Sequence, residues 1–140
     1  MGINLTAAEL LEVFGDHDPT GHVAEAEQRW GDTDAYRESH RRASSYTKQD
    51  WLDIKREGEQ VNAAFVAALD AGLPPDSPEA AAAATAHRAH ITSRFYEVSD
   101  EMHQGLAQMY VADDRFMRSY DDQRPGLAQY VCDAILALYR

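Results

Sequence analysis

The sequence predicts an all-α fold, and three observations support the prediction. Apolar residues recur at the helical period in several segments, no segment alternates between apolar and polar residues as a strand does, and β-branched residues are few. The chain has 140 residues, of which 44% are hydrophobic, so its length suits one domain with one modest core. We therefore expect residues 1–140 to form a single helical domain.

The sequence of the N-terminal segment predicts short helices that have few large apolar side chains to bury. Thr6 and Glu9 form a capping box for a first helix, and residues 22–30 and 34–44 suit two more. These segments carry few large apolar side chains, and isolated helices of this length are marginal in water. We therefore expect residues 1–45 to be weakly held, in contrast to a stable core from 46 to 140.

Residues 46–140 predict longer helices with clear boundaries. They are expected at 48–71, 78–96 and 100–111, and from Pro125 to the C-terminus, with a short helical turn and a loop at 112–123. Side chains that can cap helix N-termini stand at Thr33, Thr47, Ser77 and Ser99. Gly72 suits the end of the first long helix.

Each long helix has an apolar stripe that predicts its buried face. The stripes are Trp51, Ile54, Val61, Phe65, Ala68 and Leu69; Met102, Leu106, Met109 and Tyr110; and Leu127, Tyr130, Val131, Ala134, Ile135 and Leu138. The alanine run at 80–84 would let a neighbouring helix approach closely. Gly58 lies on the first stripe, where it costs about 1 kcal/mol against alanine. A close helix crossing would explain it.

The charge and the single cysteine exclude several classes of function. A net charge of −11 and a pI near 4.8 argue against binding of nucleic acid or of anionic membranes by this chain. No apolar run approaches the ~20 residues of a membrane-spanning helix, and the N-terminus does not resemble a signal peptide. Cys132 alone cannot form an internal disulfide or a cysteine-built zinc site. We expect a cytoplasmic protein without a cofactor.

The sequence shows no catalytic constellation. It has no glycine-rich phosphate loop and no Gly-x-Ser-x-Gly motif. His87 and His90 lie three residues apart on one predicted helix and His103 lies on the next, so a zinc or haem site is conceivable. No carboxylate is clearly placed beside them, and partly buried histidines with hydrogen-bond partners are the commoner case. Cys132 lacks a histidine nearby in sequence to activate it as a nucleophile.

Aromatic residues, methionines and histidines concentrate between residues 87 and 120. They are His87, His90, Phe95, Tyr96, Met102, His103, Met109, Tyr110, Phe116, Met117 and Tyr120. Such side chains suit a pocket for a flat ligand rich in heteroatoms. They equally suit an aromatic core, and periodicity alone favours the core. Trp30 stands in a polar segment, where a large aromatic residue needs something to bury against.

Three segments closely resemble the TipAS family, the antibiotic-recognition domain of some MerR-type transcription activators. They are EAEQRWGDTDAYRESHRRASSYTKQDW (25–51), MHQGLAQMYVADDRF (102–116) and RPGLAQYVCDAILA (124–137). The opening, MGINLTAAELLEVFGDHDP, resembles the start of the separately translated short form of the thiopeptide-induced regulator. The resemblance covers nearly the whole chain.

The resemblance implies a globin-like fold without haem and a non-enzymatic function. The ligands would be macrocyclic thiopeptides or other bulky heteroaromatic antibiotics, and residues 1–45 would form a mobile lid that orders over the ligand. In a full regulator, a DNA-binding domain and a dimerising coiled coil would precede this domain and engage promoter DNA and RNA polymerase. As an isolated domain the chain would be a monomer that sequesters the drug.

The expected ligand-binding side chains combine the aromatic cluster with its apolar neighbours. They are Trp30, Tyr36, His87, His90, Ile91, Phe95, Tyr96, Met102, His103, Leu106, Met109, Tyr110, Phe116 and Tyr120. Some members of the family carry cysteines in the segment matching 96–110, and one such cysteine forms a thioether with the antibiotic. Val98 and Gly105 stand there in this chain. We therefore expect reversible binding, unless Cys132 faces the pocket.

Two alternatives from other classes stay open at this point. The aromatic and methionine patch would also serve a domain that binds another protein. The three histidines would also serve a globin-like protein that binds haem or a metal ion.

Overall fold

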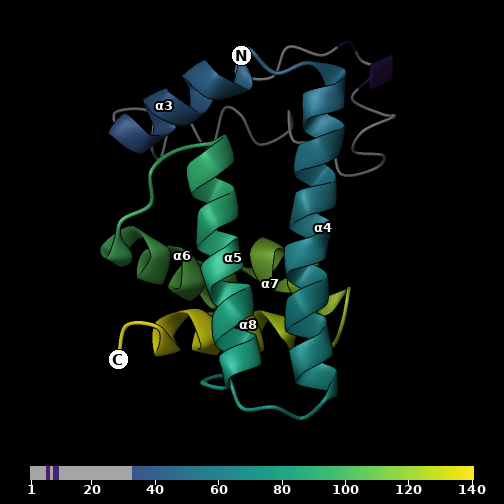
Figure 1. Cartoon of the computed structure of the whole chain (residues 1–140), viewed down its shortest axis with the longest axis vertical. Coiled ribbons are helices and arrows are strands. Elements are labelled where there is room, and N and C mark those ends of the chain that lie inside the picture. The colour runs from purple at the N-terminus through teal and green to yellow at the C-terminus, as the bar shows by residue number, and fades with distance from the viewer. Residues whose placement is uncertain (1–5, 7, 10–32) are drawn as a thin grey trace. The chain divides into compact units, whose positions relative to one another are not determined.

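A computed structural model describes residues 6, 8, 9 and 33–140 of the chain. These residues form six labelled helices and no strand, so the expected all-α class is confirmed for them (Figure 1). The helices are α3 (Asp34–Ala43), α4 (Lys48–Asp70), α5 (Pro78–Arg94), α6 (Asp100–Ala112), α7 (Asp114–Asp121) and α8 (Leu127–Ala137). The chain divides into two compact units, Met1–Gly58 with His90–Glu97, and Glu59–Ala89 with Val98–Arg140. Each unit is described by itself.

The predicted helix starts are confirmed by their caps. The hydroxyls of Thr33, Ser77 and Ser99 accept hydrogen bonds from the backbone N–H three residues on, at 3.1 to 3.2 Å. Thr6 and Glu9 form the expected reciprocal box, in which Glu9 N–H donates to the Thr6 hydroxyl and Thr6 N–H donates to the Glu9 carboxylate. Such caps satisfy N–H groups that the first helical turn leaves without a partner.

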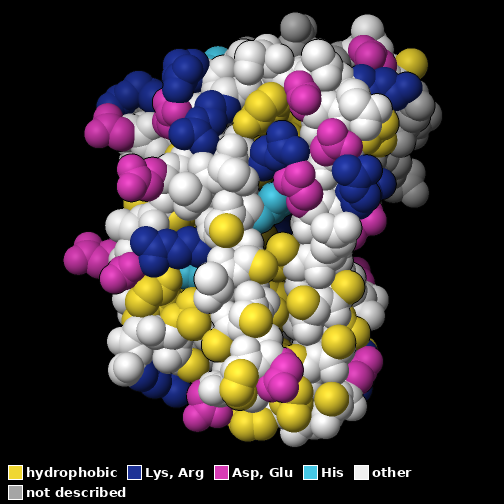
Figure 2. Space-filling view, in the orientation of Figure 1, with side chains coloured by type: hydrophobic (Ala, Val, Ile, Leu, Met, Phe, Trp, Pro, Cys, Tyr) yellow, Lys and Arg dark blue, Asp and Glu magenta, His cyan; other side chains and the backbone are white. Residues whose placement is uncertain are grey.

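The first unit has a small aromatic core. Among its described residues, Ala43, Trp51 and Ile54 are buried, and Tyr46, Leu52 and Phe95 pack around them. These side chains come from α3, from the connection between α3 and α4, from the first part of α4 and from the residue after α5. Arg41 and Glu38 of α3 form an ion pair. Figure 2 shows that basic and acidic side chains often lie next to one another on the face that it draws.

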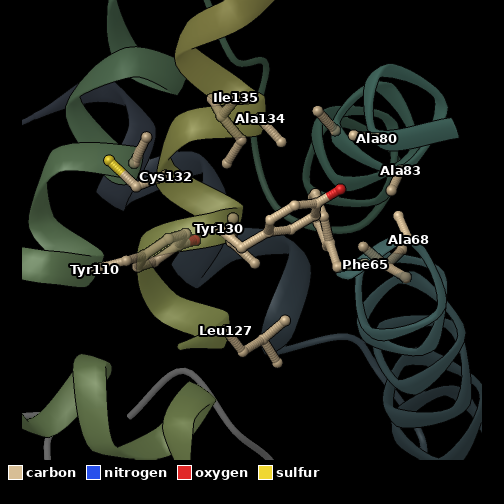
Figure 3. Packing of buried hydrophobic residues seen from close by; sticks show 14 residues of the cluster. Phe65, Ala68, Ala80, Ala83, Tyr110, Leu127, Tyr130, Cys132, Ala134 and Ile135 are labelled. Carbon is tan, nitrogen blue, oxygen red and sulfur yellow. The ribbon is translucent and has the colours of Figure 1, made fainter. Parts of the chain in front are cut away.

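The second unit holds the larger core, in which α6, α7 and α8 contact one another. The α8 stripe is confirmed, because Leu127, Val131 and Ile135 are fully buried there. Phe65 of α4 is also fully buried (Figure 3). The alanine run of α5 packs as expected, with Ala80, Ala83 and Ala84 at most 2% exposed. Tyr130 lies in this core and donates its hydroxyl to the carbonyl of Leu73 at 2.9 Å.

The structure corrects two element boundaries. Residues 114–121 form the complete helix α7, whereas a short turn and a loop were expected. Asp113 caps this helix by accepting from the Arg115 N–H, a signal hidden among the neighbouring acidic residues. The last helix begins at Leu127 and not at Pro125, because Gly126 adopts a φ of 86° that is outside the helical range. The Asp121 carboxylate caps α8 instead, accepting from the Ala128 N–H at 3.0 Å.

One prediction about a buried face was only partly right, and one about a helix crossing was wrong. On α6 Tyr110 of the predicted stripe is buried and Leu106 and Met109 pack against the core, but the other fully buried positions are His103 and Ala107. The stripe was assigned by hydropathy, which discounts a buried histidine. Gly58 does not mark a crossing too close for a side chain either, because a Cβ there would meet Cε1 of His90 at 3.6 Å, an ordinary contact.

Candidate functional site

The predicted ligand-binding residues fall into both units. Trp30 lies outside the described residues. Five of the others belong to the first unit: Tyr36, His90, Ile91, Phe95 and Tyr96. The remaining eight belong to the second unit: His87, Met102, His103, Leu106, Met109, Tyr110, Phe116 and Tyr120.

Four polar side chains of the second unit form one buried network. We call His87, His103, Tyr110 and Tyr139 the histidine–tyrosine network. Nδ1 of His87 lies 3.0 Å from Nε2 of His103, and Nε2 of His87 lies 3.0 Å from the Tyr110 hydroxyl. Nδ1 of His103 lies 2.5 Å from the Tyr139 hydroxyl. The two imidazole rings are stacked at an interplanar angle of 16°. All four ring nitrogens therefore have partners within the chain.

Both histidines of the network are buried, which favours their neutral forms. His87 is 7% exposed and His103 is fully buried. Burial, aided by the positive charge of Arg88, lowers the pKa of His103 to about 4, although Asp100 opposes the shift. His103 is therefore uncharged at pH 7, and a ring whose nitrogens are both engaged has no lone pair left for haem or zinc. The described residues also contain no group of three possible metal ligands.

Arg88 joins the network to the surface of the unit. Its Nη1 donates to the Tyr139 hydroxyl at 3.2 Å and to the Asp100 carboxylate at 2.7 Å. Its Nε donates to the Val98 carbonyl at 3.0 Å. One arginine therefore ties α5 to the start of α6 and to the C-terminal tyrosine.

At the other end of the network, the aromatic rings of α7 contact α6. The ring of Tyr110 lies 5.0 Å from that of Tyr120 and 5.9 Å from that of Phe116, measured between centroids. Burial raises the pKa of Tyr120 to about 12, and a hydrogen bond with Tyr110 only partly offsets it. Phe116 and Tyr120 are partly buried, as are Met102, Leu106 and Met109 of α6. These five side chains keep some exposed surface, so they are better placed to meet a ligand than the two histidines.

The first unit contains a second aromatic group around Trp51. The Trp51 ring lies 5.5 Å from that of Tyr46, edge to face, and 6.3 Å from that of Phe95. We call Tyr46, Trp51 and Phe95 the tryptophan cluster. Tyr46 also donates its hydroxyl to the Arg94 carbonyl, which fixes the end of α5 against the start of α4.

An ion pair lies beside the tryptophan cluster. Arg94 donates two hydrogen bonds to Glu57, at 2.9 and 2.6 Å. This pairing holds the pKa of the Glu57 carboxyl below its usual range. His90 stands 3.4 Å from the same carboxylate, but burial lowers the pKa of its imidazole. Its ring meets Phe95 edge to face at 6.4 Å.

The other predicted residues of the first unit are partly buried. Tyr36 lies on α3 with its ring 6.3 Å from that of His40. Ile91 is in the last turn of α5, and its carbonyl accepts from the N–H groups of Phe95 and Tyr96. Burial raises the pKa of the Tyr96 hydroxyl.

Sequence reasoning missed four residues of these two groups. Tyr46 was given no role and Trp51 was assigned only to a core stripe, although two aromatic residues near a helix start resemble the cluster predicted further along. Tyr139 lies beyond the segment in which the aromatic residues concentrate, and Arg88 is a charged residue in a helix rich in alanine. Only the tertiary fold brings these two to His103.

Cys132 does not present a reactive thiol. Its side chain is 3% exposed, and it points from α8 toward α6 within the core (Figure 3). Burial raises the pKa of the thiol, so little thiolate forms at neutral pH. Val98 is buried, while Gly105 is exposed with open space where a side chain would begin.

No helix in the described part of the chain is long and apolar enough to cross a membrane.

Comparison with known proteins identifies relatives over nearly the whole sequence. The family described as the TipAS antibiotic-recognition domain matches residues 22–138. The HTH-type transcriptional activator TipA of Streptomyces coelicolor is 51% identical over 137 residues, which are 98% of this chain and 54% of that protein. The HTH-type transcriptional activator mta of Bacillus subtilis is 32% identical over 71% of this chain and 38% of its own length. The chain therefore spans about half of the first relative.

Two solved structures resemble the fold. One is a structure of TipAS from Streptomyces lividans in complex with nosiheptide, with a TM-score of 0.88, 50% identity, and coverage of 96% of this chain and 94% of that one. The other is the antibiotic-binding domain of a TipA-class multidrug resistance transcriptional regulator, with a TM-score of 0.58 and 47% identity. It covers 62% of this chain and 93% of its own. The likeness confirms the expected globin-like helical class.

Proposed function

The chain belongs to the TipAS family of antibiotic-recognition domains, and on that premise we propose that it binds thiopeptide-type macrocyclic antibiotics without transforming them. The observation that carries the proposal is the 50% identity with a TipAS structure that holds nosiheptide, over nearly the full length of both chains. The relatives are transcriptional activators and antibiotic-binding domains, which supports a binding function over an enzymatic one.

The partly exposed aromatic and apolar side chains are the proposed contacts for the ligand. They are Tyr36, Ile91, Phe95, Tyr96, Met102, Leu106, Met109, Phe116 and Tyr120, together with Trp30. Aromatic rings and methionines can stack on the azole rings of a thiopeptide. His87, His103 and Tyr110 are buried and bonded to one another, so we assign them to the support of this surface. His90, beside Glu57, is the histidine with a place for a polar contact.

Binding is proposed to be reversible. The segment 96–110 contains no cysteine, and Cys132 is buried with a raised pKa. Covalent capture of a dehydroalanine requires a thiolate that can reach it. We further propose that residues 1–45 contribute to the site and become protected when the ligand binds, since the family implies a lid there.

Sequestration is the action that the chain can perform by itself. Because the relatives are about twice its length, activation of transcription needs a DNA-binding part, and we propose that this chain is the sensor of such a regulator. A sensor that reports to promoter DNA and RNA polymerase acts in the cytoplasm of a bacterium.

The proposal is tested by two-dimensional amide NMR of the protein with and without one equivalent of nosiheptide. We expect amide signals of residues 1–45 to shift and gain protection from hydrogen exchange. The variant Trp30→Ala should bind nosiheptide more weakly, with the melting temperature of the free protein nearly unchanged. Tyr130→Phe is the matched control, because it removes a buried hydrogen bond to Leu73 and should lower the melting temperature without changing affinity. An unchanged spectrum would remove thiopeptides as ligands.

A further inference from the structure

The hydrogen bonds of the histidine–tyrosine network can be arranged in only two ways, which we call its two proton orders. A neutral imidazole has one N–H donor and one acceptor nitrogen. His103 and His87 each use both ring nitrogens within the network. Each ring must therefore donate on one side and accept on the other, so the contacts from Tyr139 through His103 and His87 to Tyr110 all run in one direction or all in the other.

Arg88 makes one of the two proton orders more stable than the other. Its guanidinium can only donate, and it donates to the Tyr139 hydroxyl at 3.2 Å. If Tyr139 accepts from Arg88 and donates to Nδ1 of His103, each group in this part of the network is satisfied. In the opposite order, the Tyr139 oxygen would accept from both Arg88 and His103, and its own proton would need a further acceptor.

The charges around the network favour the same order. A positive charge near one end stabilises hydrogen bonds whose protons point away from it. Arg88 lies at the Tyr139 end, and Asp100 is 2.7 Å from the same guanidinium nitrogen, which weakens the effect without reversing it. The charged or titratable groups near the two rings include Arg88 of α5, Asp100 and Tyr110 of α6, and Tyr139 beyond α8.

We propose that Arg88 is a positioning residue that fixes the proton order of the network, so that His103 and His87 are both protonated at Nε2. Nε2–H of His103 then donates to Nδ1 of His87, and Nε2–H of His87 donates to the Tyr110 oxygen. The Tyr110 proton is left to point away from His87.

In this way Arg88, on α5, controls the direction of a hydrogen bond made by a residue on α6. Arg88 stands at the surface end of the network, yet it decides whether Tyr110 accepts from His87 or donates to it. The inference concerns the free protein and does not depend on which ligand the domain binds.

The tautomers of both histidines are measured directly by long-range proton–nitrogen NMR of the imidazole rings at pH 7. We expect the Nε2–H form at His87 and His103 in a roughly tenfold excess, which corresponds to about 1.4 kcal/mol. A dominant Nδ1–H form at either ring would overturn the proposal in the unaltered protein, whatever the variants do.

Three variants separate the donor function of Arg88 from its packing. Arg88→Met keeps the apolar stem and should let the two tautomers approach equal populations. Arg88→Lys retains a donor and should restore the Nε2–H form. Asp100→Asn breaks the ion pair but leaves the Tyr139 contact, so its Nε2–H excess should be at least as large as that of the unaltered protein. Unchanged tautomers in a folded Arg88→Met protein would show that Arg88 does not set the order.

Discussion

The buried state of His103 predicts a loss of stability in mild acid that one substitution should remove. The pKa of His103 is lowered from 6.5 to about 4 in the folded protein. Between these two values the unfolded chain binds a proton that the folded protein does not. The contribution of the neutral His103 to the free energy of unfolding is therefore fully present above pH 6.5 and is lost as the pH drops toward 4.

The magnitude follows from the two pKa values. A difference of about 2.5 in pKa, at 1.36 kcal/mol for each unit, gives a total loss of about 3 kcal/mol when the pH has fallen below 4. At pH 5 the unfolded imidazole is almost fully protonated and the folded one is mostly neutral, so about 2 kcal/mol of this loss is already present.

The assay is urea unfolding at pH 7 and pH 5, in the unaltered protein and in His103→Gln. Glutamine has an amide nitrogen near the position of Nε2 and does not titrate. We expect the drop in unfolding free energy between the two pH values to be smaller in the variant by about 2 kcal/mol. His90 lies outside the histidine–tyrosine network, so its contribution is the same in both proteins and cancels in this comparison. Equal drops in the two proteins would refute the assignment of His103 as a buried neutral imidazole.

Four further outcomes follow from the packing. Gly58→Ala should raise the free energy of unfolding by about 0.5–1 kcal/mol, and with it the melting temperature, because helix propensity improves and the new Cβ fits beside His90. A lower melting temperature would contradict this. Gly126→Ala should cost about 1 kcal/mol in urea unfolding because its φ is 86°, and no loss would show that the αL turn relaxes. Phe65→Ala should cost about 3–5 kcal/mol, and a loss below about 1 would mean that the core collapses around the cavity. Cys132 should react with a disulfide reagent only after denaturant is added, so a fast reaction in the native protein would place the thiol at the surface.

The predictable parts of the fold were those that local sequence determines. A capping hydroxyl acts within one turn of its helix, so Thr33, Ser77 and Ser99 were identifiable without any tertiary contact. Helix α8 was equally clear, because its buried face is apolar throughout. Its start was misplaced by two residues, since proline is common at the first helical position and here it precedes a glycine in the left-handed region.

The candidate site was harder to predict because its polar groups are buried. Hydropathy places histidine outside a core, whereas His103 is fully buried and satisfied by His87 and Tyr139. The partners come from α5 and from the residues after α8, far apart in sequence. The concentration of aromatic residues was visible in the sequence, but which of them support the site and which keep exposed surface depends on the packing.

The central claim is reversible antibiotic binding, and calorimetric titration of the protein with nosiheptide, followed by intact-mass measurement under denaturing conditions, tests it most directly. The account predicts saturation at one ligand per chain, and a denatured protein whose mass equals that of the unmodified chain. A titration without heat or saturation would contradict binding. An added mass equal to that of nosiheptide would contradict reversibility and show that Cys132 or another nucleophile captures the ligand.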